Sequence, residues 1–289
     1  MTTSQRIMVI GAGQMGSGIA QVAAQAGYQV LLSDLDQEMT ARALQTIEAR
    51  LQREVERAHA PPAGCASVLA RITPTTGLEG CEGSDWVIEA ASERLELKRK
   101  LFRELGQRTG KATILASNTS SLSITEIAAA SGSPRRVIGM HFMNPVPRMM
   151  LVEVIQGLDT AEATSTATME LARSLGKEPV LVKDYPGFIS NRLLLPLINE
   201  AIFAVHEGVA EVEAVDRIMQ LGMNHPMGPL ALADLIGLDT CLAIMEILQQ
   251  GFGDDKYRPC PLLVKMVRAG RLGRKSGQGF YPYPASRPL

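Results

Sequence analysis

The sequence is poor in the features that mark several classes of protein. Its 289 residues include only four cysteines, Cys65, Cys81, Cys241 and Cys260, and no two of them form a CxxC pair. This spacing predicts a reduced, metal-free intracellular chain, because zinc sites and disulfide frameworks use closely spaced or paired cysteines. The histidines other than His141 also lack a second ligand at metal spacing, so we predict no metal site.

Net charge and long apolar runs are also scarce. Basic and acidic residues nearly cancel, leaving a net charge of -1, which argues against a broad attraction to nucleic acid or to an anionic membrane. No uncharged apolar stretch reaches the roughly 18 residues that a membrane helix needs. The apolar run near the N-terminus is too short for a secretory signal. We therefore expect a soluble, cytoplasmic protein with no nucleic-acid and no membrane partner.

What the sequence does contain, up to about residue 184, is an alternation of short apolar runs with polar stretches. The polar stretches 36–57 and 93–109 are rich in Arg and Glu and suit amphipathic helices. The apolar runs are near-continuous, as expected of parallel strands covered on both faces. They span 6–10, 29–34, 85–90, 112–117 and 136–142. This alternation predicts a Rossmann-like, doubly wound and mostly parallel α/β sheet.

The end of this region and the residues beyond it have a different character. Only eight residues, "MNPVPRMM", join 136–142 to the next run, "LVEVI", so these last strands should be antiparallel, because a parallel crossover needs a dozen residues or more. After "PVLVKD" (179–184) the segments read as helices separated by Gly and Pro, and Pro196 should kink the first of them. We predict a Rossmann domain over 1–185 and an all-α domain over 186–289.

The motif "VIGAGQMGSGIAQ" carries Gly11, Gly13 and Gly16, with Met15 before the last glycine, directly after a predicted strand. Glycines at this spacing allow a tight turn, the approach of a pyrophosphate, and close packing of helix on strand. Asp34 ends the second strand, where an acid accepts hydrogen bonds from ribose hydroxyls and repels a 2′-phosphate. We predict an NAD site; the alternative is an ordinary glycine turn and a solvated acid.

Glu153 is an unusual residue for its position, because it stands inside the apolar run "LVEVI". An isolated buried carboxylate costs several kcal/mol unless a partner compensates it. The antiparallel pairing brings His141 close to Glu153. Histidine can remove the proton of a hydroxyl group near neutral pH, and a buried acid would fix its tautomer. The alternative is a buried histidine and a glutamate that faces a polar cavity.

Together, "SNTSSL" (117–122), "HFMNPVP" (141–147) and "LVEVI" make the sequence resemble the L-3-hydroxyacyl-CoA dehydrogenase family. The segments "NHPMGPLALADLIGLDT" (224–240) and "GRLGRKSGQGFY" (270–281) are most similar to its short-chain branch, the 3-hydroxybutyryl-CoA dehydrogenases. The resemblance covers almost the whole chain. It implies an oxidoreductase of fatty acid metabolism that interconverts L-3-hydroxyacyl-CoA and 3-oxoacyl-CoA with NAD. It also implies a homodimer formed through the helical domain.

The resemblance also assigns roles to single residues. His141 and Glu153 fall on the catalytic pair of the family, and Ser120 on its substrate-facing serine. Asn118 would lie beside the nicotinamide, and Asn191 near the substrate carbonyl and the histidine. On the residues alone, Ser120 is as readily a helix N-cap and Asn191 a solvated helical residue.

Three further residues match family positions. Glu93 and Lys98, in "EAASERLELK", fall on cofactor and active-site positions, and Lys275 is similar to the lysine that reaches the cofactor from the helical domain.

Two departures from the family stand out. The smaller is Met143 in place of a second Phe and Arg148 in place of an apolar residue; the larger is a whole segment. The lysine-rich stretch that contacts the CoA phosphates in relatives is replaced by 51–72, where Arg53 and Arg57 are the candidate phosphate partners. A substrate carried as CoA is expected. The alternatives are a carrier-protein thioester, a free hydroxy or sugar acid, and an inactive relative that only binds NAD.

Overall fold

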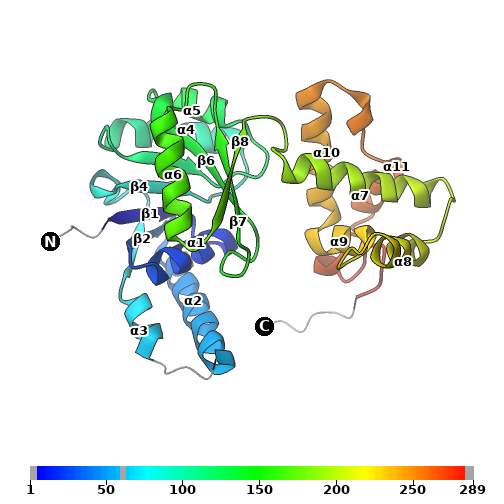
Figure 1. The fold of residues 1–289 in the computed structure, drawn as a ribbon, viewed down its shortest axis with the longest axis horizontal. Coiled ribbons are helices and arrows are strands. Elements are labelled where there is room, and N and C mark those ends of the chain that lie inside the picture. Colours follow the sequence, from blue (N-terminus) through cyan, green and yellow to red (C-terminus); the bar gives the residue numbers. More distant parts are fainter. Residues whose placement is uncertain (1–4, 59–62, 284–289) are drawn as a thin grey trace. The chain divides into compact units, whose positions relative to one another are not determined.

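The computed structural model describes residues 5–58 and 63–283, apart from the side chains of Arg57, Ala58 and Ala63. The chain divides into two compact units, which cover residues 1–185 and 186–289. Figure 1 shows a sheet flanked by helices in the first unit and a set of helices in the second.

The first unit contains an eight-stranded sheet with the order β3-β2-β1-β4-β5-β6-β7-β8. The pairs from β3 to β6 are parallel, β6 and β7 are antiparallel, and β8 is parallel to β7. The strands are β1 (Arg6–Ile10), β2 (Gln29–Asp34), β3 (Ile72–Thr76), β4 (Trp86–Glu89), β5 (Ile114–Ser117), β6 (Val137–Phe142), β7 (Leu151–Gln156) and β8 (Glu178–Lys183). The predicted sheet, mostly parallel with reversed last strands, is confirmed.

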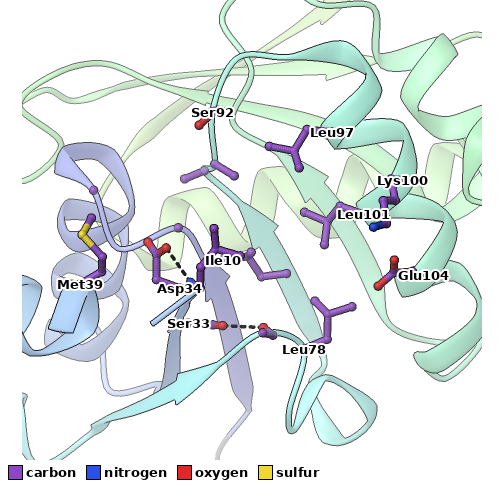
Figure 2. A pocket seen from close by; sticks show the side chains of 16 residues that line it. Ile10, Ser33, Asp34, Met39, Leu78, Ser92, Leu97, Lys100, Leu101 and Glu104 are labelled. Carbon is purple, nitrogen blue, oxygen red and sulfur yellow. Dashed lines mark hydrogen bonds between the residues drawn. The ribbon is translucent and has the colours of Figure 1, made fainter. Parts of the chain in front are cut away.

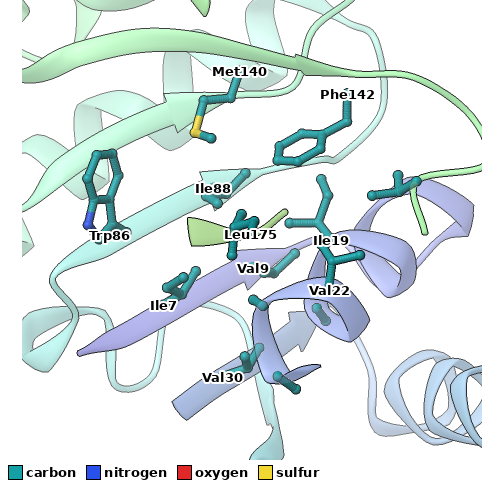
Figure 3. Packing of buried hydrophobic residues seen from close by; sticks show 14 of the residues in the cluster. Ile7, Val9, Ile19, Val22, Val30, Trp86, Ile88, Met140, Phe142 and Leu175 are labelled. Atoms are coloured by element: carbon teal, nitrogen blue, oxygen red, sulfur yellow. The ribbon is translucent and has the colours of Figure 1, made fainter. Parts of the chain in front are cut away.

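Helices cover both faces of this sheet because its strands are apolar on both faces. Along β1, Ile7 and Val9 enter the core cluster packed beneath α1, which Figure 3 shows, while Met8 and Ile10 enter the cluster with α4 and α5. The helices of this unit are α1 (Gln14–Gln25), α2 (Gln37–Ala58), α3 (Ala63–Leu69), α4 (Leu95–Arg108), α5 (Ile124–Ala130) and α6 (Glu162–Ser174), with the 3₁₀ turns η1 (Cys81–Gly83) and η2 (Pro134–Arg136).

The strand β3 was not predicted from the sequence. Its residues, "ITPTT", are mostly polar and include Pro74, which reads as a loop. Proline is tolerated here because β3 is an edge strand of the sheet and pairs only with β2.

The second unit is helical in its described part, with two isolated β-bridges near its end. Its elements are α7 (Ser190–His206), α8 (Val212–Gly222), α9 (Pro229–Ile236), α10 (Leu238–Phe252) and α11 (Pro261–Arg268), with η3 (Asp255–Tyr257) and η4 (Arg274–Ser276). Pro196 lies inside α7, and the helix continues through it. Leu195, Ile198, Leu230 and Met245 belong to a separate buried core. Across the described ranges, no helix is both long and apolar enough to cross a membrane.

Two buried carboxylates hold the last turns of the second unit. Asp216 accepts hydrogen bonds from the first backbone N–H groups of α9 and from the Tyr281 hydroxyl, at 2.8–2.9 Å. Asp234 accepts from the backbone N–H groups of Phe280 and Tyr281 and from the Tyr283 hydroxyl, at 3.0–3.1 Å. The segment that resembles the family motif at 270–281 is therefore fixed to the helical core.

Candidate active site

The glycine turn after β1 has the geometry of a dinucleotide-binding turn. Gly11 has a φ of 103°, and a Cβ there would lie 2.5 Å from the Ala90 carbonyl oxygen. A Cβ at Gly16 would lie 1.7 Å from the Gly11 carbonyl oxygen, so α1 can pack against the turn only with glycine at that position. Glycine is thus required by the fold at these two positions.

Gly13 differs, because the fold itself does not require glycine there. Its φ is -70°, and a Cβ would meet no described atom within 4 Å. Gly13 also precedes the first turn of α1, whose N–H groups donate to no capping side chain. Open space in front of a helix N-terminus fits the approach of a pyrophosphate, so these residues suit NAD.

A cavity of about 450 Å³ opens at the carboxyl ends of β1, β2 and β4. Figure 2 shows the side chains that line it. Its lining includes Gly11, Gly13 and Asp34, and its apolar walls are formed by residues such as Leu78 and Leu101. Ligands of open α/β sheets bind at this edge of the sheet, and the apolar walls fit a flat base such as adenine.

Met15, which was also predicted to bind the cofactor, does not line this cavity. It is half-buried and packs against the core beneath α1.

The carboxylate of Asp34 is held in place at the mouth of this cavity. Its Oδ2 accepts the backbone N–H of Ala12 at 2.6 Å, and its Oδ1 accepts that of Leu35 at 2.7 Å. Each carboxylate oxygen has a second lone pair, so Asp34 can still accept hydrogen bonds from a ribose.

His141 and Glu153 are direct partners in the antiparallel ladder of β6 and β7, so their side chains project from the same face of the sheet. The distance from His141 Nδ1 to Glu153 Oε2 is 2.8 Å. Glu153 is 2 % exposed and His141 is 8 % exposed. The buried acid thus has the histidine as a hydrogen-bond partner, and this contact explains its place in an apolar strand.

This contact also determines which ring nitrogen of His141 carries a hydrogen. An ionised carboxylate only accepts, so Nδ1 must be the donor, and in the neutral ring Nε2 then has the lone pair. Next to the histidine, Asn118 Oδ1 accepts the backbone N–H of Phe142 at 2.9 Å, while the Asn118 N–H donates to the Glu89 carbonyl at 2.7 Å. Asn118 therefore ties the ends of β4, β5 and β6 together.

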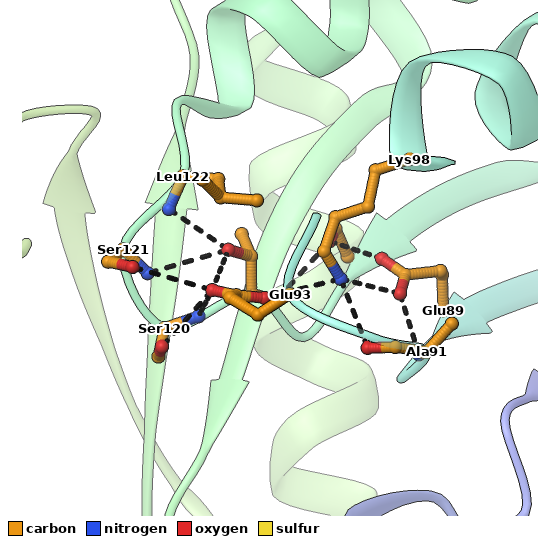
Figure 4. A network of polar contacts seen from close by, with 9 residues as sticks. Glu89, Ala91, Glu93, Lys98, Ser120, Ser121 and Leu122 are labelled. Atoms are coloured by element: carbon orange, nitrogen blue, oxygen red, sulfur yellow. Dashed lines mark hydrogen bonds and ion pairs between the residues drawn. The ribbon is translucent and has the colours of Figure 1, made fainter. Parts of the chain in front are cut away.

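The predicted residues Glu93 and Ser120 are in contact, as Figure 4 shows. Glu93 Oε1 accepts the Ser120 N–H at 2.8 Å, the Ser120 hydroxyl at 3.1 Å and the Thr119 hydroxyl at 2.6 Å. Burial alone raises the pKa of Glu93, but the charge of Lys98 and these hydrogen bonds together lower it below its usual range. Ser120 is not the cap of α5, because Ser123 accepts the N–H of Glu126 in that position.

Lys98 is placed in a buried ion pair that sequence analysis did not predict. The Lys98 side chain is 1 % exposed, and its Nζ lies 2.6 Å from Glu89 Oε1 and 3.4 Å from Glu93 Oε2. Glu89 also accepts from Ser117 Oγ at 2.6 Å and from the Ala91 N–H at 2.7 Å. The available signal was the same as for Glu153, an acid in an apolar run, here "DWVIEA".

The remaining predicted residues lie elsewhere. Asn191 lies in the first turn of α7, and Lys275 in η4 donates to Asp239 Oδ2 at 2.6 Å. Both belong to the second unit, and their roles toward substrate and cofactor stay predictions. In α2, Arg53 is exposed, whereas the side chain of Arg57 lies outside the described part.

Arg50, which lies one turn before Arg53, was not predicted as a site residue. Its guanidinium is partly buried and donates to Ser17 Oγ at 3.2 Å. Burial lowers its pKa, although Glu54 opposes this. Within the described part of the chain no carboxylate lies at ion-pair distance from it. Arg50 is therefore a further candidate for pairing with an anionic group of a ligand.

The fold and these contacts define the class of the protein as a dinucleotide-dependent oxidoreductase. Residues 6–185 match the family described as 3-hydroxyacyl-CoA dehydrogenase, NAD binding domain, and residues 187–283 match the C-terminal domain of the same family. The chain belongs to the 3-hydroxyacyl-CoA dehydrogenase family, and the predicted family, enzyme class and cofactor are confirmed.

Relatives and solved structures agree with this assignment. The chain is 58 % identical to a probable 3-hydroxybutyryl-CoA dehydrogenase of Bacillus subtilis, over 96 % of this chain and 97 % of that protein. It is 51 % identical to a 3-hydroxybutyryl-CoA dehydrogenase of Bradyrhizobium diazoefficiens, over 99 % and 97 % of the two chains. The crystal structure of (S)-3-hydroxybutyryl-CoA dehydrogenase from Ralstonia eutropha is similar with a TM-score of 0.95 and 47 % identity, over 98 % and 100 % of the chains.

Proposed function

We propose that this chain interconverts 3-hydroxybutyryl-CoA and acetoacetyl-CoA with NAD, and that His141 is the general acid and base. The observation that carries the proposal is the buried 2.8 Å contact between His141 Nδ1 and Glu153 Oε2, on the sheet whose carboxyl edge also carries the glycine turn. The choice of 3-hydroxybutyryl-CoA as substrate is supported by the similar proteins, which are named 3-hydroxybutyryl-CoA dehydrogenases.

The proposed chemistry follows from these side chains. Oxidation of the C3 hydroxyl removes one hydride and one proton; bound NAD supplies the hydride acceptor. His141 Nε2 takes the hydroxyl proton, and Glu153 stabilises the positive charge that the ring then carries. In the reductive direction the protonated ring returns this proton to the C3 oxygen. Because Glu153 holds Nδ1, the ring cannot present the wrong nitrogen.

Other predicted residues take supporting roles in this proposal. Ser120, whose N–H and hydroxyl are held by Glu93, would position the substrate, and Asn191 would hydrogen-bond its carbonyl. Asn118 and Lys275 would contact the cofactor. Glu93 and Lys98 would shape the edge of its site.

The acyl carrier is proposed to be CoA. Arg53 and Arg57 remain its candidate phosphate partners, and the partly buried Arg50 adds a cation with no described carboxylate partner on the same helix. A carrier-protein thioester is the second candidate, because the 51–72 segment lacks the lysines that resemblance led us to expect.

We also propose a homodimer formed through the helical unit, in the cytoplasm. The support is a set of exposed apolar side chains on α7 and α8, namely Leu193, Ile218 and Leu221, which are 59–74 % exposed. Sedimentation of the purified chain should give twice the mass of the monomer, and Leu221→Glu should shift it toward the monomer.

The oxidation of NADH by acetoacetyl-CoA tests the reaction directly. The wild-type chain should turn over, and His141→Ala should lower kcat by about 100-fold or more. No turnover above the His141→Ala variant would refute the proposed function.

The carrier is tested by presenting the same acetoacetyl group on CoA, on pantetheine and on an acyl carrier protein. The highest kcat/KM is expected with CoA, and Arg50→Ala should lower it for CoA but not for pantetheine. A preference for the carrier protein would instead support the second candidate.

A further inference from the structure

The loop 143–150 joins the strand that carries His141 to the strand that carries Glu153, and a buried lysine holds this loop. Lys177, which precedes β8, is only 5 % exposed. Its Nζ donates to the carbonyl oxygen of Val146 at 2.6 Å and to that of Met149 at 2.9 Å. The loop folds back between these two carbonyls, since the N–H groups of Arg148 and Met149 both donate to the Pro145 carbonyl.

Lys177 is an unusual cation for a protein interior. None of the described carboxylates lies at ion-pair distance from it, and burial lowers its pKa. A buried ammonium group is costly unless hydrogen bonds replace its water, and here the two loop carbonyls do so. The same two bonds fix the conformation of the loop.

The other side of this loop contacts the helix that begins at the glycine turn. Gln14 Nε2, in the first turn of α1, donates to Asn144 Oδ1 at 3.1 Å. One turn further along, a Cβ at Gly18 would lie 2.8 Å from the Cβ of Val146, so Val146 packs directly on the α1 backbone. The loop held by Lys177 therefore rests on the end of α1 where the dinucleotide phosphates are expected.

We infer that Lys177 is a positioning residue for the cofactor. It fixes the turn from Val146 to Met149, and this turn seats Asn144 and Val146 against the first turns of α1. The inference rests on the proposed function, because it assumes that this end of α1 binds NAD. His141 and Glu153 are held by the regular ladder of β6 and β7, so their contact does not depend on Lys177.

The test is the affinity for NADH, measured by fluorescence titration without substrate. Lys177→Met, which keeps the length of the side chain but removes its charge, should weaken the Kd for NADH about 10-fold through lost pre-organisation. At saturating NADH, kcat of the folded enzyme should remain close to that of the wild type. Lys177→Arg, which can still donate to both carbonyls, should recover most of the affinity.

Lys183→Met is the matched control, because Lys183 is an exposed lysine of β8 that contacts Gln156 and not the loop. It should leave the Kd for NADH unchanged.

Gln14→Ala is a second variant that tests the inference if Lys177→Met does not fold, since Gln14 is exposed. It should also weaken NADH binding, and its effect should not add to that of Lys177→Met, because both act through the same loop.

A wild-type Kd in folded Lys177→Met, or in Gln14→Ala where Lys177→Met does not fold, would overturn the inference. A lower kcat at an unchanged Kd would overturn it as well, because it would show a general structural role. These results are independent of the proposed function, whose failure would appear in the wild-type chain as NADH binding without oxidation by acetoacetyl-CoA.

Discussion

Two buried glutamates in the first unit are compensated by different partners. Glu153 is hydrogen-bonded to the imidazole of His141, which can gain and lose a proton. Glu89 instead forms an ion pair with Lys98 and accepts hydrogen bonds from Ser117 and Ala91. The first arrangement suits proton transfer. The second suits a fixed charge pair that holds the strand ends around Glu93 and Ser120.

Replacing Glu89 should therefore be costly to stability. Glu89→Gln leaves Lys98 buried without its main partner and should lower the free energy of unfolding by about 3 kcal/mol, measured by urea denaturation. The double variant Glu89→Gln with Lys98→Met should regain much of this loss, because it removes the unpaired ammonium while the amide oxygen can still accept from Ser117 and Ala91. Glu82→Gln, which alters an exposed pair with Arg108, is the control and should change little. Equal stabilities of the Glu82 and Glu89 variants would contradict this account.

The two glutamates also differ in how far the sequence predicts them. The contact of Glu153 with His141 follows from the chain itself, because eight residues cannot form a parallel crossover. The partner of Glu89 depends on how α4 packs against the sheet, which no local pattern determines. Likewise, the loop lysine Lys177 gives no signal in the sequence, since its partners are backbone carbonyls.

Among the elements, apolar periodicity predicted the interior strands and failed at one edge. The strand β1 was predicted with its observed bounds, and β4 to within one residue at each end. The edge strand β3 was missed because an edge tolerates Pro74 and polar side chains. The apolar pattern of a sequence indicates which residues are buried, and the residues of β3 are less buried than those of an interior strand such as β4.

The C-terminal segment of the second unit depends on contacts that periodicity does not report. Burial raises the pKa of Tyr281, and its hydrogen bond to Asp216 raises it further. The folded state therefore binds the phenolic proton more tightly than the unfolded state. The stability from this group is complete below the unfolded pKa of about 10 and is lost as pH rises through the higher folded pKa.

Tyr281→Phe tests this prediction. The variant should be less stable than the wild type by about 1 kcal/mol at pH 7, because Asp216 loses a donor. The difference should shrink as pH rises above about 10 in thermal unfolding experiments. Tyr185→Phe, at an exposed tyrosine, is the control. A difference that stays constant with pH would contradict the role of the Tyr281 proton.

At the scale of the whole molecule, each unit keeps its own core and its own buried thiols. Cys81 lies in the first unit, and Cys241 and Cys260 lie in the second; all three are 0 % exposed. Burial raises the pKa of each of these thiols, that of Cys241 to about 12. Only the thiolate form reacts readily, so these three should be inert in the folded chain.

A thiol reagent at pH 8 should therefore modify one cysteine of the native chain, the partly exposed Cys65, and all four in denaturant. Mass spectrometry of the labelled peptides identifies the site, and Cys65→Ser should remove the fast reaction. Rapid labelling of Cys241 in the native state would show that the second unit opens. The number of cysteines is read from the sequence, but their reactivity requires the two cores.

The measurement that tests the central claim most directly is kcat for NADH oxidation by acetoacetyl-CoA in Glu153→Gln. An amide can still occupy the site, but it cannot stabilise a charged His141 ring, and it can donate to Nδ1 and favour the wrong tautomer. We predict that kcat falls by about 100-fold or more while the Kd for NADH is unchanged. A variant with wild-type kcat would contradict the assignment of His141 and Glu153 as the catalytic pair.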